Sequence, residues 1–387
     1  MPVPSSTPSC PWTRARADRR DPPPGHRGGL SPRFRPLAGR AVKPFANRLL
    51  AWWKSHGRHD LPWQHPRTAY RVWVSEIMLQ QTRVETVVPY FLAFMERFPD
   101  LARLARAPVD DVLACWSGLG YYSRARNLHR AAGICLEDHG GRLPSSQEEL
   151  EALPGIGRTT AAAILALAHD QPRAILDGNV KRVLARHAGI EGWPGKSSVA
   201  GKLWKEAEAR VPAKNAAAYT QAIMDLGAGV CTRSRPACEK CPVAGDCVAW
   251  LEGRTEQLPG PRPKKTLPRR CREFWLVCDH HSRILLARRP PAGIWGGLWC
   301  LPEADELAGL DPEKGRLETT IQHTFTHFRL EMKIRRALIS PADAVTDNSE
   351  LEWMSVDQAM GRGLPQPVRR LLESGLAGPD RTRQPTE

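Results

Sequence analysis

Apolar residues recur every three or four positions along most of the first two thirds of the chain. The stretch "VWVSEIMLQQTRVETVVPYFLAFMERF" (72–98) is a clear example. This period puts apolar side chains on one face of a helix, and prolines divide the region into separate helices. These prolines are Pro99, Pro108, Pro144 and Pro154. We therefore expect a mainly α-helical domain over residues 43–251.

The pattern changes after residue 251. Residues 252–270 contain four prolines and are basic, which predicts a linker. The stretch "EFWLVCDHHSRILLARR" (273–289) predicts two strands around a turn, and "TTIQHTFTHFRLEMKIRRALI" (319–339) predicts a long strand or hairpin. A helix is expected to begin at "VDQAM". The sequence thus predicts a smaller α/β domain over residues 271–375.

The two ends of the chain have little to bury. Residues 1–42 are rich in Pro, Gly, Ser and Arg, and we expect a disordered basic extension there, with a disordered tail over 376–387. The Arg-rich start loosely resembles an organelle transit peptide, but its prolines prevent a continuous amphipathic helix. No apolar run approaches the ~20 residues that cross a bilayer. We expect a bacterial cytoplasmic protein, associated with the nucleoid and not with a membrane.

Charge points to a polyanionic partner. The 387 residues carry a formal charge of +15, of which residues 1–40 supply +6, so that +9 remains on the rest. The extension therefore explains only part of the excess. Nucleic acid is the leading candidate partner.

Four cysteines lie close together in "CTRSRPACEKCPVAGDC" (231–247), whereas the other six are scattered and suggest no disulfide framework. Four thiolates this close can bind Zn²⁺ or an iron–sulfur cluster, and the single compact run favours a cluster. The four are Cys231, Cys238, Cys241 and Cys247. Between them stand three cations that can contact DNA phosphates: Arg233, Arg235 and Lys240.

The segment "LPGIGRTTAAAILALA" (153–168) predicts a tight turn that leads into a helix. Gly155 and Gly157 would expose backbone N–H groups at the helix start, which is a site for a phosphate. The alternative is an ordinary turn between two helices.

Two carboxylates are candidates for catalysis. Glu76 would share a helix face with Val72, Trp73 and Leu79, and an apolar setting raises a carboxyl pKa and suits a general acid. Asp177, in "ILDGNVKRVLARH", reads as the N-cap of an amphipathic helix and as a second carboxylate of the site. The alternative for Glu76 is a solvent-facing or capping glutamate.

Together these motifs resemble the endonuclease III and MutY branch of the helix-hairpin-helix DNA glycosylases. The strings "SEIMLQQT", "LPW", "GLGYYSRARNLH", "WPGK" and "QAIMDLGAGVCTRS" are similar to MutY-type adenine DNA glycosylases in particular. The resemblance implies a helix-hairpin-helix glycosylase fold with an iron–sulfur loop and a C-terminal Nudix-like domain. It also implies excision of adenine opposite 8-oxoguanine or guanine in duplex DNA, the first step of base excision repair.

The resemblance also assigns roles to single residues. Glu76 would protonate adenine N7, Asp177 would stabilise the sugar cation and Asn179 would orient Asp177. Residues of the adenine pocket would be Trp63, Leu79 and Gln221, with Gln81 and Tyr121 beside 8-oxoguanine. Core packing is the alternative for Trp63, Leu79 and Tyr121. The four cysteines would bind one [4Fe–4S] cluster, and Gly155, Gly157, Arg233, Arg235 and Lys240 would contact the DNA backbone.

Three further positions refine this interpretation. Thr159 stands where bifunctional relatives carry a Schiff-base lysine, so we expect a monofunctional glycosylase. The C-terminal domain lacks the Arg-Glu-x2-Glu-Glu part of a Nudix box after Gly297, so we do not expect nucleotide hydrolysis. Instead, "HTFTHF" resembles the Phe-Ser-His loop that reads 8-oxoguanine, here Phe325, Thr326 and His327, although the alternation also fits an amphipathic strand.

Other classes of protein compete with this interpretation. An endonuclease III-type glycosylase/lyase for oxidised pyrimidines is opposed by Thr159 and by the second domain. A non-catalytic lesion-binding protein is opposed by the presence of both carboxylates, and so is a zinc-stapled transcription factor. We expect a monomer that also contacts downstream repair or replication proteins.

Overall fold

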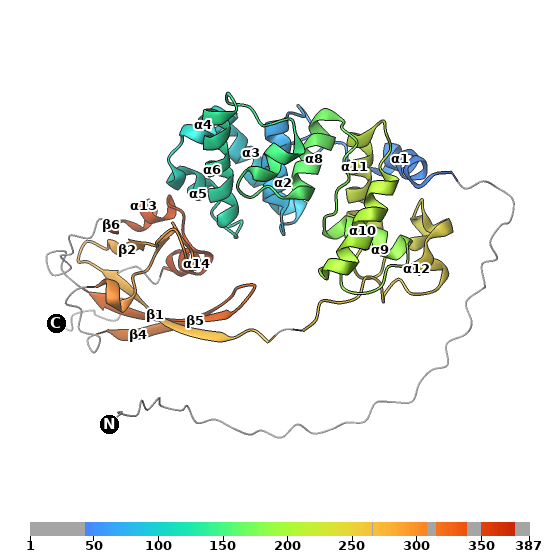
Figure 1. Ribbon diagram of the computed structural model, residues 1–387. Helices are drawn as coiled ribbons and strands as arrows, with labels where there is room; N and C mark the ends of the chain where they lie inside the picture. The colour runs from blue at the N-terminus through green and yellow to red at the C-terminus, as the bar shows by residue number, and fades with distance from the viewer. Residues whose placement is uncertain (1–42, 265, 308–314, 339–349, 376–387) are drawn as a thin grey trace, which may run out of the picture. The chain divides into compact units, whose positions relative to one another are not determined.

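The computed structural model describes residues 43–264, 266–307, 315–338 and 350–375 (Figure 1). The predicted disordered segments 1–42 and 376–387 lie outside these residues. As predicted, residues 45–251 are helical. The helices are α1 (Phe45–His56), α2 (Ala69–Leu79), α3 (Val84–Arg97), α4 (Leu101–Arg106), α5 (Val109–Cys115), α6 (Ser123–Asp138), α7 (Gln147–Ala152), α8 (Arg158–His169), α9 (Gly178–His187), α10 (Ser197–Arg210), α11 (Ala216–Asp225) and α12 (Val248–Leu251). Within the described part of the chain, no helix is both long enough and apolar enough to span a membrane.

Helices α2 and α8 form the centre of the helical part. α2 is buried on most of its surface, and it packs against α8. α8 is buried from Thr160 to Leu167, and its alanines let the neighbouring helix approach closely. α11 packs against α8 and α1 on another side. The C-terminal end of α2 and the N-terminal end of α8 line the same cleft and can therefore share one site.

The long apolar pattern of residues 72–98 is interrupted in the structure. α2 ends at Leu79 and α3 begins at Val84, with Gln81 between them at φ 60°. A periodic pattern cannot reveal this break, because the apolar residues resume in phase after four residues. The break carries Gln80 and Gln81 out of the helix and onto the surface.

The predicted turn of residues 153–168 lies between α7 and α8. Gly155 adopts φ +80°, and a Cβ there would lie 2.9 Å from the Cβ of Asn127, so the position requires glycine. Gly157 is the N-cap of α8 in an extended conformation, which other residues also adopt. Only the first of the two glycines is therefore required by the backbone.

The C-terminal part is an α/β unit around a six-stranded sheet of order β3-β2-β1-β5-β4, with β6 paired to β2 (Figure 1). The predicted strand pair is β1 (Arg269–Cys278) and β2 (Ile284–Arg288). The segment predicted as a long strand or a hairpin is a hairpin of β4 (Arg316–Thr324) and β5 (Arg329–Leu338). The remaining elements are β3 (Trp299–Cys300), β6 (Leu351–Met354), α13 (Val356–Met360) and α14 (Gln366–Glu373).

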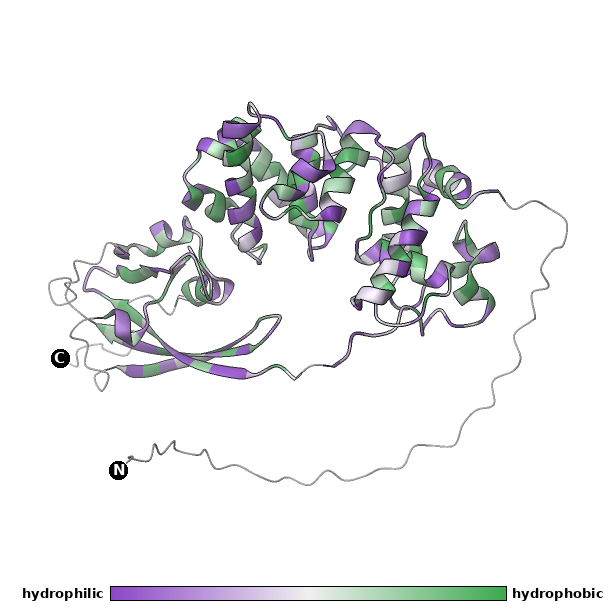
Figure 2. Ribbon diagram, viewed as in Figure 1, coloured by the Kyte–Doolittle hydropathy of each residue, from purple (hydrophilic) through white to green (hydrophobic). Residues whose placement is uncertain are grey.

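Polar and apolar residues alternate along β4 and β5, as the colours of Figure 2 show. The apolar positions of β5 join a core with β1 and α14 that contains Phe274, Leu330 and Leu371. One face of the hairpin therefore packs on this core, and of the turn residues only Thr326 and His327 are exposed, since Phe328 belongs to the core and Phe325 packs against it.

Candidate active site

A cleft of about 670 Å³ brings together residues from five separate parts of the helical sequence. Its lining includes all of the predicted catalytic and adenine-pocket residues. These are Trp63, Glu76, Leu79, Asp177, Asn179 and Gln221. The cleft contains both carboxylates, although they lie 101 positions apart in the sequence.

Glu76 lies near the C-terminal end of α2, on the side that faces the cleft. Its pKa is raised from 4.5 to about 7, mainly by burial and also by the negative charge of Asp177. Both effects disfavour the ionised form. A carboxyl group with this pKa is protonated in a large fraction of molecules near neutral pH, as a general acid must be.

Asp177 is the N-cap of α9, as its sequence context predicts. Its Oδ1 accepts a hydrogen bond from the Val180 N–H at 2.7 Å. Burial raises the pKa of Asp177, while hydrogen bonds from the backbone N–H groups of Val180 and Asn179 and the charge of Arg182 lower it. The helix start thus fixes this carboxylate and partly offsets the cost of burying its charge.

Asn179 is fixed by Arg182, a residue that the sequence analysis does not identify. The Arg182 guanidinium donates to Asn179 Oδ1 at 2.8 Å, to the Gly227 carbonyl at 2.6 Å and to the Cys231 carbonyl at 2.7 Å. Gly227 allows this close packing, since a Cβ there would lie 2.7 Å from the Cβ of Asn179. The start of α9 is therefore bonded directly to the first residue of the cysteine loop.

Gln221 is oriented by Asp225, which lies one turn later on α11 and is 4% exposed. Asp225 also accepts from Trp53 Nε1 at 2.9 Å and from the Arg58 backbone N–H and guanidinium at 2.6–2.9 Å. An ionised carboxylate can only accept, so the Gln221 NH₂ group must face it. The Gln221 amide oxygen is therefore the atom left for a ligand in the cleft.

Trp63 and Thr159 also form part of the cleft wall. Trp63 is 5% exposed and packs edge-to-face with Phe91, with ring centroids 5.4 Å apart, so it belongs to the core as well as to the cleft wall. Thr159 lies in the first turn of α8 and lines the same cleft as Glu76 and Asp177. Thr159, which stands where bifunctional relatives carry a lysine, thus lines the cleft that contains both carboxylates.

Gln81 and Tyr121 do not line this cleft. They line a smaller cavity of about 220 Å³ together with Asn127 and Gly155 of the hairpin region. Tyr121 is 47% exposed and lies at φ 48°, so the alternative of a core aromatic is wrong for this residue. The two residues expected beside the opposite base therefore share one surface site.

The four cysteines lie in one loop of two short 3₁₀ turns, and each is partly buried. Burial raises the pKa of Cys238, and so do the charges of Cys231 and Cys247, which shows that the thiols lie within electrostatic reach of one another. No three His, Cys, Asp or Glu side chains in the described residues are close enough to bind a single metal ion. Four cysteine thiols in one compact loop are a ligand set that an iron–sulfur cluster can use.

The cations of this loop are exposed. Arg233, Arg235 and Lys240 form no ion pair within the part of the chain that the structure describes, and Arg233 lines the cleft. Arg186 donates to the Thr232 and Arg233 carbonyls at 2.6 and 3.1 Å, which fixes the backbone of the loop. The loop can therefore present cations to phosphates beside the cleft.

The Phe325–His327 segment forms the turn between β4 and β5. Thr326 and His327 are exposed, whereas the Phe325 ring stacks on Phe328 with centroids 4.5 Å apart. These residues line neither of the two cavities described above. The alternation that also fitted a plain strand ends at this turn, where the exposed side chains of Thr326 and His327 lie 3.3 Å apart, within hydrogen-bonding distance of each other.

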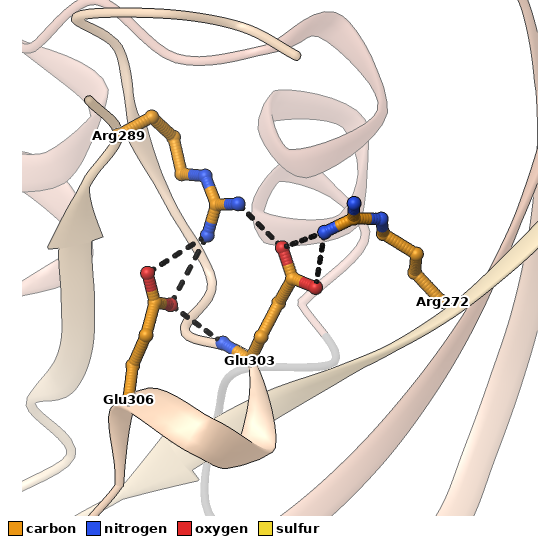
Figure 3. A network of polar contacts seen from close by, with 4 residues as sticks. All are labelled: Arg272, Arg289, Glu303 and Glu306. Atoms are coloured by element: carbon orange, nitrogen blue, oxygen red, sulfur yellow. Dashed lines mark hydrogen bonds and ion pairs between the residues drawn. The ribbon is translucent and has the colours of Figure 1, made fainter. Parts of the chain in front are cut away.

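Two acidic residues that follow Gly297, Glu303 and Glu306, form ion pairs with arginines (Figure 3). Arg272 donates to both oxygens of Glu303 at 2.7 and 3.0 Å, and Arg289 pairs with Glu303 and with Glu306 at 3.0 Å. Carboxylates occupied in this way are poor ligands for Mg²⁺, which requires free oxygen donors.

Most residues that position the site have partners far away in the sequence. Arg58 and Asp225 are 167 residues apart, and no local pattern connects them. Arg182 could have been found, because it lies three positions after Asn179 on a predicted helix and such pairs are neighbours.

Comparisons with known proteins identify the family of the chain. Residues 74–209 match the family model described as HhH-GPD superfamily base excision DNA repair protein, and residues 273–374 match the NUDIX domain model. The adenine DNA glycosylase of Buchnera aphidicola from Acyrthosiphon pisum is 38% identical over 342 residues, covering 85% of this chain and 97% of that protein.

Two further comparisons extend these. The human adenine DNA glycosylase is 43% identical over 372 residues, covering 78% of this chain and 68% of that protein. A solved structure of a thermostable thymine-DNA glycosylase matches with a TM-score of 0.49 at 28% identity, covering 54% of this chain and 95% of that one. Because its similarity to these glycosylases extends over most of the chain, the chain belongs to the adenine DNA glycosylase family of base excision repair proteins.

Proposed function

We propose that this protein is a monofunctional adenine DNA glycosylase that removes adenine opposite 8-oxoguanine or guanine in duplex DNA. The observation that carries the proposal is the cleft shared by Glu76 and Asp177, with the pKa of Glu76 raised to about 7. Two carboxyl groups in unlike environments can divide acid and charge-stabilising roles between them.

Glu76 is the general acid of this mechanism. It transfers a proton to N7 of adenine, and the C1′–N9 bond then breaks with its electron pair moving to N9, so that adenine leaves as a neutral base. Asp177, fixed as the N-cap of α9, lies ready to stabilise the positive charge that develops on the sugar. Water adds at C1′, its proton passes to a carboxylate, and an abasic site remains.

Adenine reaches these groups only after it has left the base stack. Trp63 and Leu79 offer apolar walls for the base, and Gln221 offers an amide oxygen that can accept from the adenine amino group. Guanine carries a carbonyl oxygen at position 6 instead of an amino group, so it has no hydrogen to donate to the Gln221 oxygen there. The cleft chemistry therefore favours adenine over guanine as the base that is excised.

Thr159 is the reason for proposing a monofunctional enzyme. Strand cleavage needs an amine that attacks C1′ and forms a Schiff base, and a threonine hydroxyl cannot do this. Because Thr159 lines the cleft, the absence of an amine at this position also counts against the alternative of an endonuclease III-type glycosylase/lyase.

We infer that Cys231, Cys238, Cys241 and Cys247 bind one [4Fe–4S] cluster. The four partly buried thiols in a single compact loop support this assignment. Bound there, the cluster would cross-link the loop, and it takes no part in the hydrolysis. Arg233, Arg235 and Lys240 would then contact phosphates, as would the backbone at Gly155 and Gly157.

Recognition of the opposite base is assigned to two surfaces. Gln81 and Tyr121 would enter the duplex beside 8-oxoguanine, and Thr326 with His327 would bond to its polar edge. The exposure of all four side chains supports these roles. We propose that the protein acts as a monomer, since each group in this scheme comes from one chain.

The test is single-turnover excision from duplexes that carry one adenine opposite 8-oxoguanine, guanine, cytosine or thymine. Hot alkali after the reaction reveals abasic sites. We expect excision opposite 8-oxoguanine and guanine only, with intact abasic strands before alkali. Glu76→Gln should bind these duplexes while excision falls by at least ~10², the usual contribution of general acid catalysis.

Glu85→Gln is the matched control, because Glu85 lines the same cleft but is exposed at the start of α3. It should cut like the wild type. Equal activity of the wild type and the Glu76 variant would refute the assignment of the acid. Release of oxidised pyrimidines instead of adenine would refute the proposed function.

A further inference from the structure

Two loops next to the proposed lesion site have unusual backbone conformations. Gln81 and Tyr121 lie at φ 60° and 48°, in the left-handed region that residues with side chains seldom adopt. Both line the 220 Å³ cavity. Such conformations are energetically unfavourable and persist only where the surrounding structure fixes them. Something must therefore stabilise both loops.

One side chain, Arg124 of α6, contacts both loops. It is 8% exposed, and its guanidinium donates to five carbonyl oxygens and one hydroxyl. From the first loop the acceptors are Ile77 O at 3.0 Å, Met78 O at 2.7 Å, Gln80 O at 2.7 Å and Thr82 Oγ1 at 3.3 Å. From the second they are Leu119 O at 3.1 Å and Gly120 O at 3.0 Å.

The positions of these acceptors are informative. Gln80 directly precedes Gln81, and Gly120 directly precedes Tyr121, so the guanidinium bonds to the peptide next to each strained residue. The Arg124 guanidinium carbon also lies 5.6 Å from the centre of the Tyr121 ring. A rigid planar group with several donors can connect these acceptors, whereas a single ammonium cannot reach them all.

The charge of Arg124 is not matched by a carboxylate. Within the described residues it forms no ion pair, and burial lowers its pKa to about 10, which leaves it protonated at neutral pH. A buried cation that only filled space in the core would be costly. The carbonyls at the C-terminal end of α2 carry partial negative charge and offset that cost.

We propose that Arg124 is a positioning residue that joins the Gln81 and Tyr121 loops into one rigid unit, preorganised to enter the duplex beside the base opposite adenine. This inference rests on the proposed function. In a preorganised unit, the Gln81 and Tyr121 side chains are already held in place before DNA binds, so binding does not have to supply the entropic cost of ordering them. Arg124 itself does not touch the DNA.

The test compares Arg124→Lys with the wild type. Arg130→Lys serves as the matched control, because Arg130 lies exposed on the same helix. Dissociation constants and single-turnover rates are measured on duplexes with adenine opposite 8-oxoguanine or guanine, with melting temperatures recorded for each variant. Losing several charge-assisted hydrogen bonds should weaken binding to the 8-oxoguanine duplex by about tenfold more than binding to the guanine duplex.

A positioning role predicts an additional result. With Gln81→Ala and Tyr121→Ala already present, Arg124→Lys should change the discrimination no further, because nothing is left to position. A merely structural role would lower the binding of both duplexes and the melting temperature in parallel, in either background, and would overturn the proposal. The Arg130 variant should match the wild type throughout.

A second variant keeps the test decisive if Arg124→Lys does not fold. Thr82→Val removes one acceptor at nearly constant volume, and it should reduce the same discrimination by about twofold to fivefold. Unchanged discrimination in Thr82→Val would then refute the proposal. If the wild type itself fails to excise adenine or to distinguish the two duplexes, the proposed function has failed and not the role of Arg124 alone.

Discussion

The pKa of Glu76 predicts how excision depends on pH. With a pKa of about 7, half of the molecules carry a protonated Glu76 at pH 7, about a tenth at pH 8 and about a hundredth at pH 9. The rate at subsaturating substrate reports the free enzyme, which is the form that the structure describes. We expect this rate to fall about tenfold per pH unit above pH 7.

The acid side of the profile depends on Asp177, which must be ionised. Burial raises the pKa of this carboxyl group, so the rate should also decline at a pH above the usual range of an aspartate. The result is a bell-shaped profile. A rate that stays constant from pH 6 to 9, or the same alkaline decline in Glu76→Gln, would refute the assignment of Glu76, whereas Glu85→Gln should keep the full profile.

The same pKa also has a consequence for stability. A carboxyl whose pKa is raised on folding contributes stability below pH 4.5, and this is lost as the pH rises through about 7. Above pH 7 the ionised Glu76 should cost between about 1 and 3 kcal/mol, the lower value reflecting screening by water in the cleft. Glu76→Gln should therefore melt several degrees higher than the wild type at pH 8 but not at pH 4. Calorimetry at both values measures the difference.

Three other predictions use different assays. Anaerobically purified protein should contain about four iron atoms per chain, and Cys238→Ser should lower iron content and DNA affinity more than the rate of the chemical step; stoichiometric zinc without iron would contradict this. Thr159→Lys should gain strand nicking and be trapped on DNA by borohydride, whereas Thr159→Arg should not, since only lysine forms a Schiff base; trapping of the wild type would refute the monofunctional assignment. Changing Thr326 and His327 together to Ala should reduce preference for 8-oxoguanine over guanine by about tenfold, and equal losses on both duplexes would mean that the loop supplies only general affinity.

Local patterns predicted most of the architecture. The period of apolar residues predicted the helical part, the alternation over 319–339 predicted the β4–β5 hairpin, and the family strings pointed to Glu76 and Asp177. Asp177 was also predictable as an N-cap, because the capping bond lies within three residues.

The groups that position the site were not predictable in the same way. Arg124 bonds to carbonyls 44–47 residues earlier, and Asp225 accepts from Trp53 at a separation of 172 residues. The sequence does not indicate which backbone carbonyl accepts a hydrogen bond, because every residue has one. The break after α2 was also hidden, since the apolar period continues on both sides of it.

The N-cap at the start of α9 ties protein stability to catalysis. The Asp177 carboxylate, which is to stabilise the sugar cation, also accepts a hydrogen bond from a backbone N–H of the helix. One side chain therefore serves both activity and folding. An alanine here would weaken the fold and remove the charge together. Asparagine can still cap the helix but carries no charge, so it separates the two roles. Among substitutions of Asp177, one that abolishes activity but leaves the protein well folded is therefore expected to introduce another capping residue.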